Sequence, residues 1–96
     1  MIHRIDSVYA QETTYTTTQA YSFILVFYGD AVPECKITIN KSPSSQSEFN
    51  TPTWTLSNMG LYRGYIYKFT NIAKGDVIHM IHNGGENIGF AIIGFV

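Results

Sequence analysis

Apolar and β-branched residues recur at every second position along most of the chain, in short runs separated by Gly, Pro, Asn and Ser. Side chains two residues apart share a face of a β-strand, so this period predicts strands rather than helices. The sequence predicts strands at 2–9, 14–18, 21–28, 35–40, 53–56, 61–69, 76–82 and 87–96. About eight strands divided by turn residues are typical of an all-β antiparallel sandwich.

The segments between these runs predict the connections of one domain covering residues 1–96. Residues 1–12 are expected to form an N-terminal arm or an edge strand, and the serine-rich stretch 41–52 is the longest predicted loop. The last two strands are separated by Asn83-Gly84-Gly85-Glu86. Because Asn-Gly favours the tight turn of a β-hairpin, the sequence predicts that these two strands pair with each other.

Three of the predicted strands carry large apolar side chains on both faces. In the strand 21–28, Phe23, Leu25 and Phe27 alternate with a second apolar set, and the strands 61–69 and 87–96 show the same doubling. An antiparallel sandwich usually keeps one face of each sheet polar. Either other parts of the chain cover the second face, or identical chains pack there. We favour packing between chains and predict as interface residues Tyr62, Ile66, Ile93 and Phe95.

The composition strengthens this prediction. Hydrophobic residues make up 45% of the chain and charged residues only 14%, against about 25% charged residues in an average domain. The formal net charge is −1 without a basic cluster, which argues against nucleic-acid binding. No run approaches the roughly 20 apolar residues of a membrane helix. The N-terminal residues lack the apolar core of a signal peptide, so we expect synthesis in a cytoplasm.

The sequence predicts no catalytic site, metal site or cofactor site. Cys35 is the only cysteine and lies in phase with Ile37 and Ile39, so we expect a buried, unreactive thiol. His79 and His82 are three residues apart and would point to opposite faces of a strand. This spacing does not place them on one metal ion. The carboxylates are scattered, and no nucleophile motif is present.

Aromatic side chains that could stack on sugar rings if exposed suggest an alternative, in which the chain is a small carbohydrate-binding module. Trp54 and the loop 41–52 would form the site, with Phe49 and Tyr65 as further aromatic contacts. The alternation Thr53-Trp54-Thr55 instead predicts that Trp54 points into the core, because the large apolar residue normally turns inward.

Five stretches, taken in order, carry a resemblance to a known class of proteins: YTTTQAYSFILVFYG, CKITIN, the serine-rich loop, LYRGYIYKFTNIAKGDVIHMI and the closing IGFAIIGFV. From Tyr15 to Val96 the chain resembles small jelly-roll modules of bacteriophage structural proteins, such as capsid decoration proteins, head fibres and tail-fibre tips. Lys74-Gly75-Asp76 matches the turn before the penultimate strand of these modules. The longer loop after Ile37-Thr38-Ile39-Asn40 departs from their pattern, in which a glycine turn follows.

The resemblance implies a jelly-roll-like sandwich that belongs to a multimeric virus particle and carries no catalytic residues. Our leading hypothesis is therefore a non-enzymatic virion structural protein, a capsid decoration or fibre component made in the host cytoplasm. Its expected partners are further copies of itself, in a trimer or another closed homo-oligomer, and other virion proteins. In the alternative hypothesis the partner is a host glycan.

Overall fold

The computed structural model of the chain describes residues 2–8, 12–29, 35–41, 49–59, 62–83 and 89–96. Within these ranges the chain forms eight strands and no helix. All pairings between the strands are antiparallel, so the predicted all-β antiparallel sandwich is confirmed. The strands are β1 (Ile2–Val8), β2 (Glu12–Thr16), β3 (Tyr21–Tyr28), β4 (Cys35–Ile39), β5 (Trp54–Met59), β6 (Tyr62–Ile72), β7 (Val77–His82) and β8 (Phe90–Phe95).

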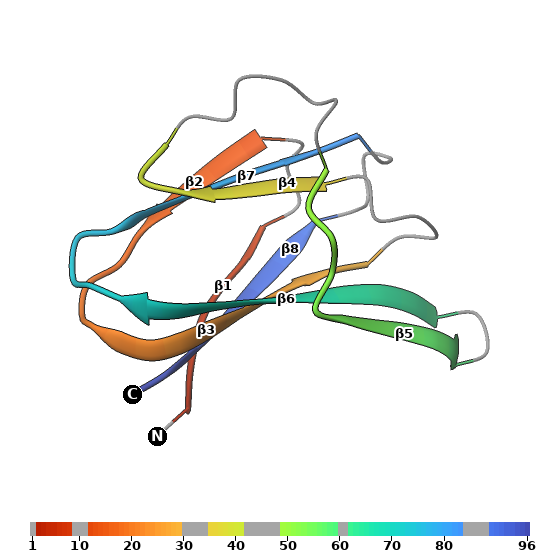
Figure 1. Cartoon of the computed structure of the whole chain (residues 1–96), viewed down its shortest axis with the longest axis horizontal. Helices are drawn as coiled ribbons and strands as arrows, with labels where there is room; N and C mark the ends of the chain where they lie inside the picture. Colours follow the sequence, from red (N-terminus) through yellow and green to blue (C-terminus); the bar gives the residue numbers. More distant parts are fainter. Residues whose placement is uncertain (1, 9–11, 30–34, 42–48, 60–61, 84–88) are drawn as a thin grey trace.

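The strands form two layers, a five-stranded sheet in the order β1-β8-β3-β6-β5 and a three-stranded sheet in the order β2-β7-β4 (Figure 1). β1 pairs with β8, β2 with β7, and β3 with β6. This is the order obtained when one long hairpin is wrapped into a sandwich, as in jelly rolls. Strands that are neighbours in the sequence therefore mostly lie in different sheets.

The fifth strand departs from this scheme, because β5 pairs with β6 and not with β4. The chain first lies along the free edge of β4, where the Asn50 amide donates to the Cys35 carbonyl and the Asn50 side chain accepts from the Ile37 amide. It then crosses to the other layer (Figure 1), where the Thr53 amide donates to the Ile66 carbonyl over 2.8 Å. Asn50 thus occupies part of the edge that a paired strand would otherwise protect.

The core lies between the inner faces of the two sheets. Its centre is formed by residues that are at most 2% exposed, and these come from both layers: Ile24, Val26 and Tyr28 of β3, Cys35 and Ile37 of β4, Tyr67 of β6, Ile78 and Met80 of β7, and Ile92 of β8. In β3 these residues alternate with Phe23, Leu25 and Phe27, which are only partly buried. The two faces assigned to this strand from the sequence are therefore confirmed.

Two of the predicted connections are corrected by the structure. β7 pairs with β2 and β4, whereas β8 pairs with β1 and β3, so the last two strands do not form the hairpin that Asn83-Gly84 suggested. The jelly-roll wrapping places them in opposite sheets, and residues 84–88 lie outside the described residues. β6 also extends to Ile72, beyond the predicted end at 69. Asn71 has a φ of 57° and reverses the alternation, so that Ile72 is buried.

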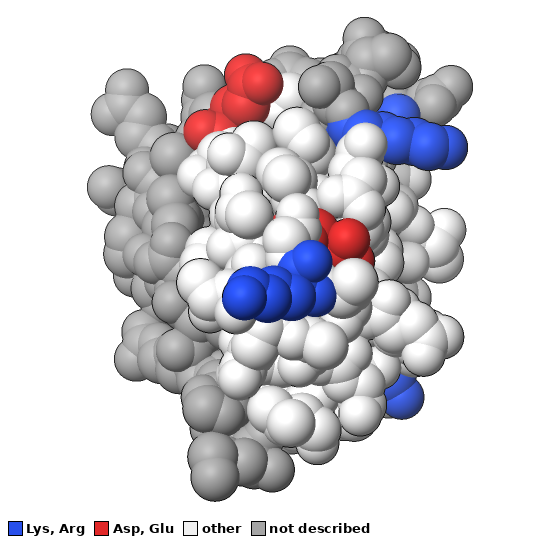
Figure 2. Space-filling model, turned by 90° about the vertical axis from the view of Figure 1, so that its left-hand side faces the viewer, with Lys and Arg blue, Asp and Glu red and all other residues white. Residues whose placement is uncertain are grey.

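A hydrogen-bonded corner connects the two sheets at the left-hand end of Figure 1. The Asp76 carboxylate accepts from the Ala73 amide over 2.8 Å and from the Asn40 side chain over 3.0 Å. Asn40 in turn accepts from the Val77 amide, and the Thr17 hydroxyl donates to the Ala73 carbonyl. The corner therefore ties β4 and the residue after β2 to the β6–β7 turn. Figure 2 shows a few charged groups among mostly uncharged described residues at this end.

We expect the Asp76→Asn variant to lose a pH-dependent part of the stability. The Asn40 side chain and the Ala73 amide donate to the carboxylate and hold the pKa of Asp76 below its ordinary value of about 3.9. A carboxyl group whose pKa is lower in the folded than in the unfolded state stabilises the fold at pH values above the unfolded-state pKa. This contribution is lost as the pH falls through the folded-state pKa. Urea unfolding at pH 7 should therefore show a less stable variant, and at pH 3 the difference from wild type should shrink. An equal difference at both pH values would contradict this account.

Candidate functional site

The most distinctive surface of the molecule is the side of the five-stranded sheet that faces away from the core. We call it the outer apolar face. The register of the strands places apolar side chains from four strands on this face. They are Phe23, Leu25 and Phe27 of β3, Trp54 and Leu56 of β5, Ile66 of β6, and Ala91, Ile93 and Phe95 of β8. Residues that are directly opposite on paired strands share a face, so these positions form one continuous surface.

The register arranges the outer apolar face in rows that run across the sheet. Phe23 lies between Thr70 and Phe95, and Leu25 lies between Lys68 and Ile93. Phe27 lies between Ile66 and Ala91, and Ile66 is also opposite Trp54. Each row thus has an apolar centre on β3. Polar residues flank these rows, with Lys68 and Thr70 on β6 and, on the other side, Arg4 of β1 opposite Ile93.

Aromatic residues of this surface interact with one another and with Lys68. The Phe23 and Phe95 rings are stacked, with centroids 4.3 Å apart and planes 14° from parallel. The Lys68 Nζ atom lies 4.6 Å from the centroid of the Phe23 ring, which is cation–π geometry. Lys68 therefore already has an interaction within its own chain.

Three of the four predicted interface residues, Ile66, Ile93 and Phe95, lie on the outer apolar face and are partly exposed. Tyr62 belongs to β6, but its side chain lies outside the described part of the structure. The interface residues predicted from the sequence did not include Trp54, which was considered only as a glycan contact, or Leu56; these two are 49% and 42% exposed. In their strand, polar and apolar residues alternate over only a few positions, and only its pairing with β6 places Trp54 and Leu56 on this surface.

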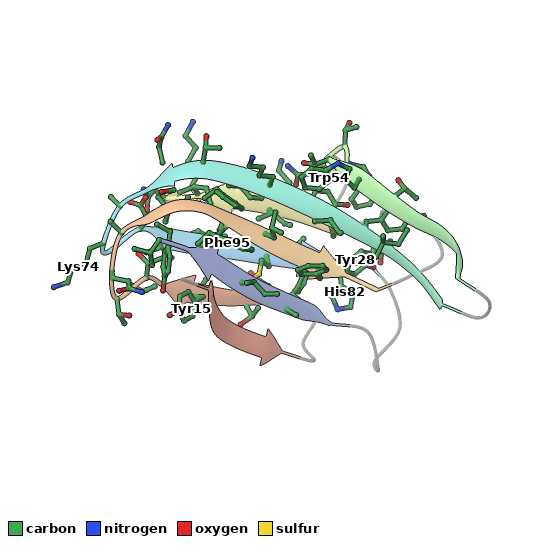
Figure 3. All side chains as sticks on the ribbon, turned by 90° about the horizontal axis from the view of Figure 1, so that it is seen from below. Tyr15, Tyr28, Trp54, Lys74, His82 and Phe95 are labelled. Carbon is green, nitrogen blue, oxygen red and sulfur yellow. The ribbon has the colours of Figure 1, made fainter. Side chains whose placement is uncertain are left out.

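The interpretation that Trp54 points into the core is wrong. Trp54 pairs with Ile66 on the outer apolar face (Figure 3), and the next residue, Thr55, is exposed as well. Polar and aromatic residues do alternate at 53–55, but β5 is the edge strand of the five-stranded sheet. The opposite sheet has only three strands and leaves β5 without a layer to pack against. Tyr65 is opposite Thr55 and is only 9% exposed. Trp54 and Tyr65 consequently lie on opposite faces and do not form one stacking platform, while Phe49 is 38% exposed before β5.

The structure also brings together a pair that the sequence did not connect. Cys35 and His82 are directly opposite on β4 and β7, and the His82 ring lies 5.5 Å from the Tyr28 ring and 5.4 Å from the Phe90 ring. A catalytic Cys–His pair needs access to substrate and a lowered thiol pKa. Both residues are at most 1% exposed, and burial raises the pKa of Cys35 to about 12. The pair is therefore part of the core.

The burial of Cys35 predicts its reactivity. At pH 8 a thiol-specific reagent should react with the native chain at least about a thousandfold more slowly than with the unfolded chain, because only the exposed thiolate is nucleophilic. The chain has a single cysteine, so the absorbance of the released reagent group reports on this residue alone. The measurement in urea at the same pH supplies the control. Prompt reaction in the native state would contradict the placement of Cys35 in the core.

His79 and His82 do not converge on a common ligand position. His79 is partly buried and points away from His82, as three-residue spacing on a strand requires. The described residues contain no group of three or more His, Cys, Asp or Glu side chains that could hold a metal ion. They also include no helix long and apolar enough to cross a bilayer.

Comparisons of the chain with protein-family models, with the curated proteins and with the solved structures find no match.

Proposed function

We propose that this chain is a non-enzymatic structural protein, a capsid decoration or fibre component of a virus particle, that assembles through the outer apolar face. The observation that carries the proposal is the continuity of this face over β5, β6, β3 and β8. Isolated apolar residues are normal on a protein surface, but a contiguous patch of this kind marks a contact with another molecule. The contact is made either with further copies of the chain or with another protein of the particle.

Two further observations support this proposal. The chain has more apolar residues than a small core requires, and the surplus is collected on one sheet face instead of being scattered. Apart from the position of β5, the strand order is that of a jelly roll, which is common among capsid proteins. A fold does not by itself specify a function. The assignment to a virus particle therefore rests on the resemblance of the sequence to phage jelly-roll modules.

Phe95→Asp tests the proposal. We expect wild-type chains to form a defined assembly as their concentration rises, and Phe95→Asp to remain monomeric with an unchanged circular dichroism spectrum. The reason is that a carboxylate in an apolar contact loses its hydration without a compensating partner. Light scattering after size exclusion gives the mass of each species. Thr14→Asp places the same charge at an exposed position of β2 in the other sheet and should leave assembly intact.

A fluorescent dye that binds apolar surfaces completes this experiment. If wild type is monomeric but binds the dye, and Phe95→Asp does not, the face is open for a different protein. If wild type neither assembles nor binds the dye, the outer apolar face is not a contact surface and the proposal fails. A Phe95→Asp chain that is insoluble would place Phe95 in the core instead.

A second candidate function, carbohydrate binding, is favoured by one observation, the half-exposed indole ring of Trp54. Such a ring can stack on the apolar side of a sugar. The buried position of Tyr65 removes one of the aromatic residues that the sequence suggested for this site. Trp54 is the only tryptophan, so a change of its emission upon addition of a sugar would support this function directly.

A further inference from the structure

We infer that the partner of the outer apolar face is an amphipathic helix of another protein, which lies along β8 and β3 and carries carboxylates on both sides of its apolar stripe. This inference rests on the proposed function, because it specifies the partner of the same face. Three features of the described residues support it: the shape of the apolar area, the positions of two cations beside it, and the distance between them.

The centre of this face is an apolar stripe that is two strands wide and runs along the strands. In each of the three rows both central strands carry an apolar residue, and these are Phe95, Ile93 and Ala91 of β8 and Phe23, Leu25 and Phe27 of β3. From the first row to the last the strands rise by about 13 Å, the length of two to three turns of an α-helix. All six residues are partly buried, so the stripe is flat. It therefore fits one element that lies lengthwise along the strands.

Positively charged residues lie on both sides of the stripe in its middle row. From β1 to β6 the register gives this row as Arg4, Ile93, Leu25 and Lys68. None of the other positions that the register assigns to the three rows carries an acidic residue. Asp6 of β1 is opposite the buried Ile92, a position on the other face of the sheet. The outer apolar face thus has the opposite sign to the whole chain, whose formal net charge is −1.

The distance between these two positions matches the width of a helix. Arg4 and Lys68 lie three strands apart in the order β1-β8-β3-β6. Because adjacent strands are about 4.8 Å apart, the two backbone positions are about 14 Å apart. An α-helix with its side chains is about 10–12 Å wide, so acidic residues on its two flanks reach one cation each. Lys68 is exposed beside the Phe23 ring, and its ammonium group can bind a carboxylate while it stays against the ring.

The same charges make a second copy of the chain the weaker partner. Two copies packed through this face would bring two arginines and two lysines into one contact, and like charges in an interface cost binding free energy. Assembly of the chain alone is therefore expected only at high concentration, where no helix competes. An amphipathic helix has one apolar stripe with polar residues on both sides, which is the complement of this face. The described residues of this chain form no helix, so a different protein supplies it.

Two synthetic peptides test this inference. Both have a leucine stripe at helical spacing, and they carry either glutamate or lysine at all positions that flank the stripe. Fluorescence anisotropy of the labelled peptides measures their binding at concentrations at which the chain alone is monomeric. We expect the glutamate peptide to bind at least about tenfold more tightly than the lysine peptide, because its carboxylates meet Arg4 and Lys68. The formal net charge of −1 would give the opposite preference if only the charge of the whole chain mattered.

Charge reversal on the face should reverse this preference. Arg4→Glu with Lys68→Glu is expected to bind the glutamate peptide at least about tenfold more weakly than wild type and to prefer the lysine peptide. Lys41→Glu with Lys74→Glu changes the net charge equally at two exposed positions outside the three rows and should keep the wild-type preference. Circular dichroism shows first whether each variant is folded. If the double variant on the face does not fold, Lys68→Glu alone retains the test, together with the weakening of wild-type binding by salt.

The outcomes separate this inference from the proposed function. The inference is overturned if wild type binds neither peptide, binds both equally or prefers the lysine peptide. The proposed function then still stands when the chain assembles, or binds the apolar dye, in a way that Phe95→Asp abolishes; without assembly and dye binding both fail. Sedimentation of wild type with vesicles of phosphatidylcholine and phosphatidylglycerol, without a preference between the peptides, would assign the face to an anionic bilayer and also overturn the inference.

Discussion

Ile24→Ala is expected to lower the free energy of unfolding by about 2–5 kcal/mol, the range for truncation of a large aliphatic side chain in a core. Ile24 is fully buried at the centre of β3, between the two sheets. The surrounding side chains come from both layers and cannot collapse into the space that the variant leaves, so the lost transfer free energy is increased by a cavity term. Urea unfolding followed by circular dichroism measures this loss.

The neighbouring residue supplies the matched control. Leu25 follows Ile24 on the same strand but belongs to the outer apolar face, where it is partly exposed. In the monomer Leu25→Ala removes fewer contacts, and we expect a loss of about 1 kcal/mol. Similar losses for the two variants in the monomer would show that the outer face is as well packed as the core, and would contradict the assignment of the two faces.

Gly94→Ala should also destabilise the fold, by about 1–3 kcal/mol, because it forces a side chain into an occupied space. A Cβ atom at position 94 would lie 2.4 Å from a ring carbon of Tyr21. Tyr21 is only 5% exposed and belongs to the core, so its ring cannot move aside into solvent. The close approach of this ring to the backbone of β8 is the reason that glycine is required here.

Gly64→Ala is the control for this substitution. A Cβ atom at position 64 would be 3.5 Å from its nearest neighbour, the Tyr28 carbonyl oxygen, which is ordinary van der Waals contact. Alanine also lowers the conformational entropy of the unfolded chain. We therefore expect an unchanged stability or a gain of up to about 1 kcal/mol. A comparison of the urea midpoints of both variants with wild type tests the pair, and a larger loss for Gly64→Ala would contradict the expectation.

The outer apolar face could be predicted from the sequence only in part. Ile66, Ile93 and Phe95 were placed on it correctly, because the alternation within one strand shows which side chains point away from the core. Trp54 and Leu56 were not, because the described side chains of their strand, 54–56, are all exposed, and the alternation there does not show which side faces the core. Only the pairing of β5 with β6 assigns them to this face.

The sequence by itself determined the properties that depend on local geometry. It showed that the chain forms short strands, and it placed the bounds of β3 at Tyr21 and Tyr28 as the structure has them. It also distinguished the two faces of that strand. These properties follow from the two-residue period and from β-branched and aromatic residues, both of which act within a few positions of the chain.

The tertiary structure decided which strands are neighbours. Asn83-Gly84 has the local chemistry of a hairpin, but β7 and β8 belong to different sheets. Cys35 and His82 are opposite each other although about half of the chain lies between them, and β5 pairs with β6 instead of β4. Pairing of this kind is selected by the burial of both sheet faces together, a cooperative property of residues that are distant in the sequence. For this reason the sequence indicated a doubly apolar sheet, and only the fold showed where its second face lies.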